Sequence, residues 1–133
     1  MPSSSVNTSA KQKKRAQDQL IQTITKALSG KKGENIIMMD LRKITTMADH
    51  FILCTGLSEN HIKTLADEVV DSCRDELGEK PWRKEGLDSK RWVVLDYVDV
   101  VVHIFREETR NFYGIERMWS DAAVTRYEET DPA

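Results

Sequence analysis

The amino-acid sequence predicts an α+β fold: a mixed α/β two-layer sandwich, in which helices pack on one face of a mixed sheet of about five strands. Three observations support this class. Two segments have the apolar spacing of amphipathic helices, several short apolar runs have the length of strands, and the two patterns alternate. The chain has 133 residues, 39% apolar and 32% charged, as expected for one globular domain.

Residues 1–15 have no apolar period, and we expect them to form a disordered arm ahead of a folded domain over residues 16–123. The arm carries Lys11, Lys13, Lys14 and Arg15. A short basic arm is most often solvated, so solvation ranks above nucleic-acid contact. The net charge of -2 gives no overall basic field, which predicts little direct nucleic-acid binding.

The first half of the domain predicts a helix, two strands and a second helix. Residues 16–28 have helical apolar spacing and Gly30 follows as a stop signal. Residues 34–41 and 50–55 contain apolar runs with the length of buried strands. Ser58 is a good N-cap for a long helix that ends at Gly78. The apolar face of that helix comprises Ile62, Leu65, Ala66, Val69, Val70, Cys73 and Leu77.

The second half predicts a short edge strand, a hairpin and a third helix. Residues 80–85 suit a sheet edge because Pro81 is tolerated there. Residues 91–96 and 99–105 are β-branched strands with a very short link. A helix then follows Glu107, and we expect its Phe112 and Trp119 to fill the core. Residues 124–133 are expected to be a polar tail.

The predicted hairpin has two unlike faces. With a loop at Tyr97 and Val98, Asp96 lies opposite Asp99. One face is apolar and suits the core: Val93, Leu95, Val100, Val102 and Ile104. The other mixes aromatic, aliphatic and charged side chains, as recognition surfaces do: Trp92, Val94, Asp96, Asp99, Val101, His103 and Phe105. Trp92 and Tyr97 are the best surface candidates, although Val98 is β-branched and suits such a loop poorly.

An enzymatic site in this hairpin would have to use Asp96, Asp99 or His103. Residues 99 and 103 lie about 13 Å apart on an extended strand, too far to share one ion. A lone histidine on a mixed strand face is more often a hydrogen-bonded structural group. No Gly-rich phosphate loop and no hydrolase triad spacing occurs in the sequence. We expect a protein that is not an enzyme.

The two cysteines, Cys54 and Cys73, lie within apolar patterns and are expected to be buried free thiols in a reducing compartment. No apolar run has the length of a spanning helix, so we expect no membrane contact. The cytoplasm is the expected location. An organelle is the alternative, because the acid-free, Ser- and Lys-rich N-terminus has the composition of a transit segment.

Several linked motifs resemble the ribosomal silencing factor (Iojap) family over roughly residues 16–123. They are DHFILCTGLS at 49–58, Glu85-Gly86, Trp92, LDYVDVVVHIF at 95–105 and RNFYGIERMWSDA at 110–122. The resemblance implies a small domain related in fold to nucleotidyltransferases but without their catalytic pattern, and it implies no cofactor. It also implies binding to the large ribosomal subunit through ribosomal protein number fourteen, which blocks subunit joining and represses translation initiation. Organelle relatives act in large-subunit assembly.

The resemblance assigns partner binding to a set of residues that match the family motif: Glu85, Trp92, Leu95, Asp96, Tyr97, Asp99 and His103. The family usually has glycine where Val98 stands and asparagine where Leu57 stands. Leu95 conflicts with the hairpin pattern, which turns it into the core. Carboxylates on the mixed face would complement a basic ribosomal protein.

Two other interpretations of the mixed face remain open. The first is a nucleotidyltransferase-like enzyme that uses Asp96 or Asp99 with a metal ion. The second is a homodimer interface in the free protein. Nucleotide titration and light scattering, respectively, distinguish them from a ribosome-binding surface.

Overall fold

A computed structural model describes the backbone of residues 2–128 and the side chains of residues 10–128. Over these residues the mixed sheet has six strands in the order β3-β4-β5-β2-β1-β6. Strands β2 (His50–Thr55) and β5 (Val100–Phe105) run parallel, and all other neighbours are antiparallel. The mixed α+β class is therefore confirmed.

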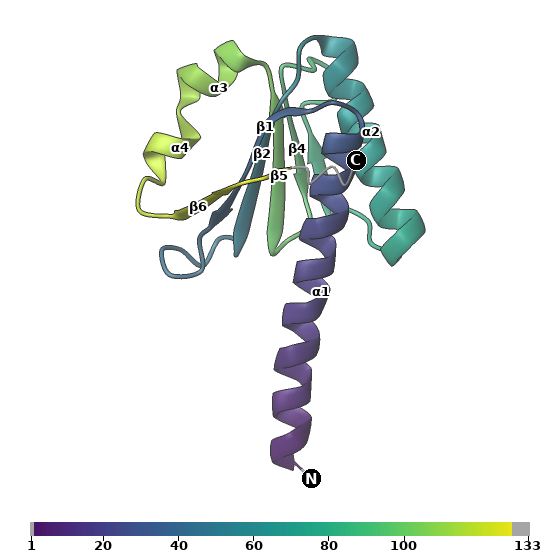
Figure 1. Ribbon diagram of the computed structural model, residues 1–133, viewed down its shortest axis with the longest axis vertical. Coiled ribbons are helices and arrows are strands. Elements are labelled where there is room, and N and C mark those ends of the chain that lie inside the picture. Colours follow the sequence, from purple (N-terminus) through teal and green to yellow (C-terminus); the bar gives the residue numbers. More distant parts are fainter. Residues whose placement is uncertain (1, 129–133) are drawn as a thin grey trace.

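Helices lie on both sides of the sheet (Figure 1). The long helices α1 (Pro2–Gly30) and α2 (Glu59–Leu77) cover one face, as predicted. The short helices α3 (Glu107–Tyr113) and α4 (Ile115–Met118) lie on the other face, which the sequence had left uncovered. The sandwich is thus three-layered over part of the sheet.

Helix α1 begins at Pro2, whereas the sequence predicted a helix from residue 16 and a disordered arm before it. The helix continues because no glycine or proline interrupts residues 3–29, and Ala, Lys, Gln and Arg favour helix. Leu20 is its first buried residue among the described side chains. The N-terminal half therefore projects from the body (Figure 1). The domain boundary at residue 16 stays a prediction.

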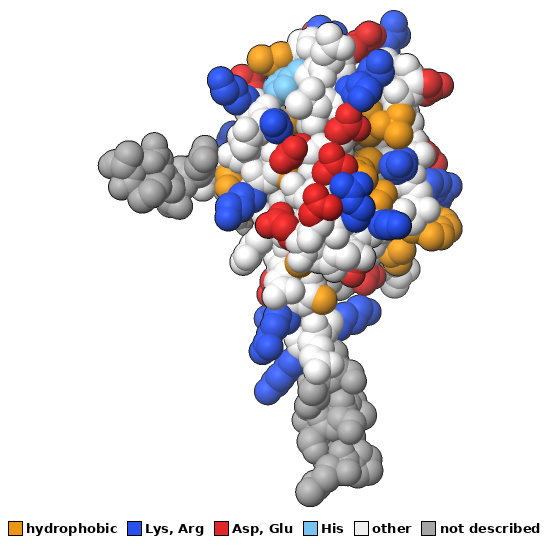
Figure 2. Space-filling model, turned by 90° about the vertical axis from the view of Figure 1, so that its right-hand side faces the viewer, with side chains coloured by type: hydrophobic (Ala, Val, Ile, Leu, Met, Phe, Trp, Pro, Cys, Tyr) orange, Lys and Arg blue, Asp and Glu red, His pale blue; other side chains and the backbone are white. Residues whose placement is uncertain are grey.

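Helix α2 has the caps that the sequence predicted. The Ser58 hydroxyl accepts the His61 N–H at 3.0 Å, and Gly78 adopts a left-handed conformation with φ of +67°. Its apolar residues pack on the sheet. Its outer face is rich in carboxylates, and acidic side chains gather along this side of the molecule (Figure 2).

The main core lies between these two helices and the sheet. All five predicted core residues of the hairpin are fully buried there: Val93, Leu95, Val100, Val102 and Ile104. Cys54 and Cys73 are also buried as free thiols. Burial raises the pKa of Cys54 to about 12 and that of Cys73 to about 11, so both remain protonated at neutral pH.

The register of the β4–β5 hairpin differs from the prediction. Strand β4 (Trp92–Asp96) pairs Asp96 with Val101, rather than with Asp99. The Tyr97 N–H donates to the Val100 carbonyl at 2.9 Å, so the loop residues are Val98 and Asp99. The pairing is displaced by an even number of positions, which preserves the face of every side chain. The predicted faces are therefore right although the register was wrong.

A smaller second core lies under α3 and α4. It is formed by Ile37, Met39, Leu41, Leu53, Phe105 and Ile115, with Trp119 packed against it. Trp119 thus contributes to a core, as expected. Phe112 does not, because 79% of it is exposed. Helix α3 turns Phe112 outward, while Phe105 fills the space beneath the helix.

The edges of the sheet are short strands. Strand β3 (Arg83–Glu85) is the predicted edge strand and pairs with β4. Strand β6 (Ala123–Arg126) pairs with β1 (Glu34–Asp40), where the sequence predicted a polar tail from residue 124. All four residues of β6 are exposed, so no buried side chain marks this strand in the sequence. Residues 129–133 of the predicted tail lie outside the described residues.

Candidate functional site

The part of the sheet beyond α3 and α4 carries a partly exposed face, here called the open sheet face. It consists of Arg83, Glu85, Trp92, Val94, Asp96 and Val101. The strand register places these side chains on the same side of neighbouring strands, since Arg83 pairs with Asp96, Glu85 with Val94 and Asp96 with Val101. The face thus combines an indole, two aliphatic side chains, two carboxylates and the Arg83 guanidinium, which forms an ion pair with Glu85 at 3.3 Å.

The seven predicted partner-binding residues are partly at the surface and partly buried. Glu85 is exposed, and Trp92, Asp96 and Asp99 are partly exposed. Leu95, Tyr97 and His103 are buried. The expectation that Tyr97 is a surface residue was wrong, because its ring packs in the main core and only 8% of the residue is exposed.

His103 holds the Trp92 indole in place through a hydrogen bond. The Trp92 Nε1–H donates to His103 Nδ1 at 3.1 Å, so the proton of the neutral imidazole lies on Nε2. Burial lowers the pKa of His103 to about 4, which keeps the ring neutral at physiological pH. Phe51 meets the imidazole edge-on with centroids 4.7 Å apart. His103 is thus a positioning residue for the indole.

Trp92 is held from other directions as well. Its ring lies 4.7 Å from that of Tyr113 on α3 and 5.7 Å from that of Phe105. Gly86, with φ of +80°, lets the preceding loop approach closely, because an added Cβ would collide with the Trp92 carbonyl oxygen. The indole is therefore pre-organised, which reduces the entropy that a contact would cost.

The turn after Asp96 has an unusual backbone. Val98 adopts φ of +75°, and the Asp99 N–H donates to the Tyr97 carbonyl at 3.0 Å, which are features of the rare, strained γ-turn. The Asp96 carboxylate accepts the Val98 N–H at 2.8 Å. This contact supports the turn and orients the carboxylate at the same time.

Beside this turn lies a groove of about 410 Å³, lined by Met47, Trp82, Arg83, Asp96 and Val98. Met47 and Trp82 are 76% and 68% exposed, and the Arg83 guanidinium lies 4.7 Å from the centre of the Trp82 ring. Met47 and Trp82 were not predicted as site residues from the sequence. No local pattern joins them, since they come from different loops that only the folded sheet brings together.

The carboxylates and histidines are spread over the fold. Among the described residues, no three His, Cys, Asp or Glu side chains come together in a group that could hold a metal ion. In the same part of the chain, no helix is both long and apolar enough to span a membrane.

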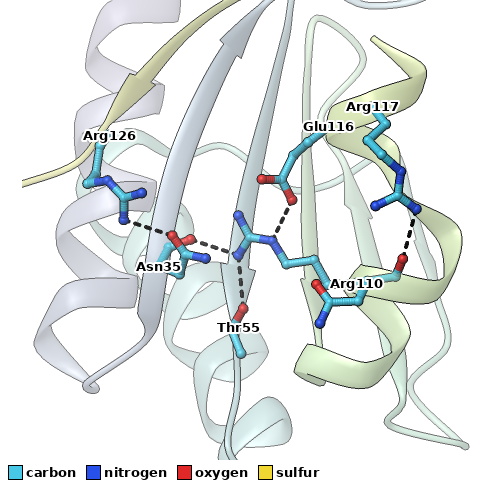
Figure 3. A network of polar contacts seen from close by, with 7 residues as sticks. Asn35, Thr55, Arg110, Glu116, Arg117 and Arg126 are labelled. Carbon is cyan, nitrogen blue, oxygen red and sulfur yellow. Dashed lines mark hydrogen bonds and ion pairs between the residues drawn. The ribbon is translucent and has the colours of Figure 1, made fainter. Parts of the chain in front are cut away.

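Arg110 fixes the position of α3 beside the open sheet face (Figure 3). It is 3% exposed and donates to Glu116 Oε1 at 2.8 Å, to the Asn35 carbonyl at 2.8 Å and to Thr55 Oγ1 at 2.9 Å. The buried guanidinium joins α3 and α4 to β1 and β2, and so helps to place Tyr113 against Trp92.

The chain is similar to proteins of known family. A model of the family "Ribosomal silencing factor during starvation" matches residues 13–133. The ribosomal silencing factor of Bacillus subtilis is 36% identical over 108 residues, which cover 81% of this chain and 91% of that protein. The factor of Chromobacterium violaceum is 38% identical over 103 residues, covering 74% and 84%. The chloroplastic Iojap protein of Zea mays is 30% identical over 103 residues, covering 75% and 43%.

Two solved structures share the fold. A crystal structure of a Chromobacterium violaceum protein gives a TM-score of 0.74 at 30% identity, covering 87% of this chain and 92% of that one. A Bacillus halodurans protein gives a TM-score of 0.71 at 30% identity, covering 84% and 99%.

Proposed function

The chain belongs to the ribosomal silencing factor family, and we propose that it binds the large ribosomal subunit through ribosomal protein number fourteen. Bound there, it blocks joining of the two subunits and represses translation initiation. It acts as a steric blocker and not as an enzyme. The observation that carries the proposal is the open sheet face, with its pre-organised indole at one end of β4 and the Asp96 carboxylate at the other.

The chemistry of this face suits a basic partner. Asp96 offers a carboxylate, and Glu85 offers a second one that Arg83 already pairs with at 3.3 Å. Ribosomal proteins are typically basic, so opposite charges would speed encounter and fix orientation. Trp92 supplies apolar area in a fixed orientation, which is what interface anchors provide. Leu95, Tyr97 and His103 act indirectly in this proposal, because they are buried and support the exposed residues. Asp99 supports the turn, since its carbonyl accepts the N–H groups of Asp49 and His50.

Co-sedimentation with purified large subunits tests the proposal. We expect wild-type protein to co-sediment and to reduce the formation of joined particles. Trp92→Ala should weaken binding by more than about 1 kcal/mol, or roughly fivefold, because the anchor is lost. Leu57→Ala is the control, since Leu57 is an apolar residue that is 60% exposed but lies at the β2–α2 connection, away from the open sheet face. Absence of co-sedimentation, or unimpaired joining, would refute the proposal.

A second copy of the chain is the competing occupant of the open sheet face. Light scattering at micromolar concentration distinguishes self-association from ribosome binding. If the open sheet face binds the ribosome, it must be free when ribosomes are absent. A dimer that Trp92→Ala converts to a monomer would assign the face to self-association.

We propose the cytoplasm as the site of action, since relatives such as the Bacillus subtilis factor are bacterial. An organelle is the alternative, because the Zea mays relative is chloroplastic. Fractionation of the source cells decides between them.

A further inference from the structure

The N-terminal half of α1 is a charged segment that the proposed function does not use. Residues 10–16 project from the body and their side chains are exposed, whereas the Gln17 amide already donates to Asp49 Oδ2 of the body at 2.8 Å. They include Lys11, Lys13, Lys14 and Arg15, which are all exposed. Figure 2 shows Lys and Arg side chains on the projecting helix next to the body. Within residues 10–128, no carboxylate forms an ion pair with any of the four.

The charge of the molecule is therefore divided between two regions. No acidic residue precedes Asp18 in the sequence. Because the whole chain has a net charge of -2 and the arm supplies four positive charges, the rest of the chain carries -6. The net charge predicts little nucleic-acid binding, but it averages over a basic arm and an acidic body. A polyanion would therefore be attracted to the basic arm and not to the acidic body.

Helical structure gives the basic side chains a fixed spacing. Lys11, Lys14 and Arg15 lie at i, i+3 and i+4, so they share one face and are separated by about 4.5 and 6 Å along the axis. Lys13 points to the opposite side. Like charges at these spacings destabilise an isolated helix by about 0.2–0.5 kcal/mol per pair. A ligand with repeated negative charges relieves this repulsion.

We propose that this arm binds the phosphodiester backbone of structured RNA. A regular RNA duplex presents phosphates in a row, which suits lysines and an arginine held along a helix. A membrane surface fits less well, because residues 10–19 contain no apolar side chain larger than alanine to insert between lipids. The arm recognises the charge and shape of the RNA backbone and does not recognise the base sequence. It stands independently of the proposed function, since it involves no ribosomal protein.

Fluorescence anisotropy of the full chain with a labelled short RNA duplex tests the proposal. We expect binding that weakens between about 50 and 200 mM salt, with a log–log slope of about −3.6 for four phosphate contacts, or roughly −0.9 for each contact. Replacing Lys11, Lys13, Lys14 and Arg15 together with glutamine should reduce affinity at least tenfold at the lower salt concentration. The magnitude of the slope should fall by about one for each charge removed.

A second quadruple variant provides the control, with the same net charge but an intact arm. It replaces Lys26, Lys43, Lys80 and Lys84, which are all exposed, with glutamine. It should retain wild-type affinity and slope. Equal losses in both variants, or no binding of wild-type protein to the duplex at low salt, would overturn the proposal. Arm-dependent binding to phosphatidylserine vesicles without RNA binding would also overturn it. Because the duplex is free RNA, these results are separable from co-sedimentation with the large subunit.

Discussion

At the scale of single residues, Val98 is the most strained position in the proposed site. A β-branched residue at φ of +75° costs about 1–3 kcal/mol, whereas glycine adopts this conformation freely. Val98→Gly should therefore stabilise the fold by about 1 kcal/mol, after the greater freedom of glycine in the unfolded chain is subtracted. Urea denaturation measures this change. Val124→Gly on β6, which lacks a positive φ, should destabilise instead.

The buried imidazole of His103 gives a prediction about pH. Because burial lowers its folded-state pKa to about 4 from 6.5, the unfolded state binds a proton first as the pH falls. The neutral His103 side chain contributes fully to the free energy of unfolding above about pH 6.5. This contribution is lost as the pH falls towards 4, and the loss is about 3 kcal/mol at most. His103→Asn keeps an acceptor for the Trp92 N–H and removes this titration.

Urea denaturation of wild type and His103→Asn at a series of pH values checks this prediction. The difference between the two proteins should be constant above pH 6.5 and should shift in favour of the variant between pH 6.5 and 4. Parallel curves over the whole range would show that His103 does not titrate in this way. The comparison of the two proteins cancels the pH dependence that other groups contribute. One such group is the Asp40 carboxyl, whose pKa the Arg42 side chain lowers to about 2.

At the scale of elements, Arg110 holds the two short helices on the sheet. Arg110→Met removes three hydrogen bonds and should destabilise the fold by about 2–3 kcal/mol, less than for a fully buried ion pair because Glu116 is partly exposed. Amide hydrogen exchange should accelerate in α3 and α4 more than in α2. Arg117→Ala is the control, since Arg117 is exposed and its side chain makes one hydrogen bond, to the Asn111 carbonyl. Its effect should stay near 0.5 kcal/mol.

The elements differ in how far the sequence reveals them. Helix α2 was predicted with its ends, because Ser58 and Gly78 are local capping signals and its apolar spacing is regular. Strand β6 was missed, since its exposed side chains leave no alternation to detect. The hairpin register was also missed, because it depends on a positive φ at Val98 that a β-branched residue argues against.

At the scale of the whole molecule, local patterns predict layers better than they predict surfaces. The alternation of helix and strand patterns was enough for the fold class. Which face of the hairpin is exposed depended on where α3 packs, and Arg110 fixes that through a contact to Asn35, 75 positions away. The partner-binding residues taken from the family motif therefore divide into exposed ones and buried supports, a division that no single strand could show.

The parallel pairing of β2 with β5 affects how the chain folds during its own synthesis. Strands β1 and β2 can pair with each other early, but β2 obtains its other neighbour only when Phe105 has been made. Until then one edge of β2 stays open, and the long helix α2 has only part of the sheet to cover. Pairings between distant segments form slowly. We therefore expect nascent chains that end before β5 to be loosely folded and prone to aggregation.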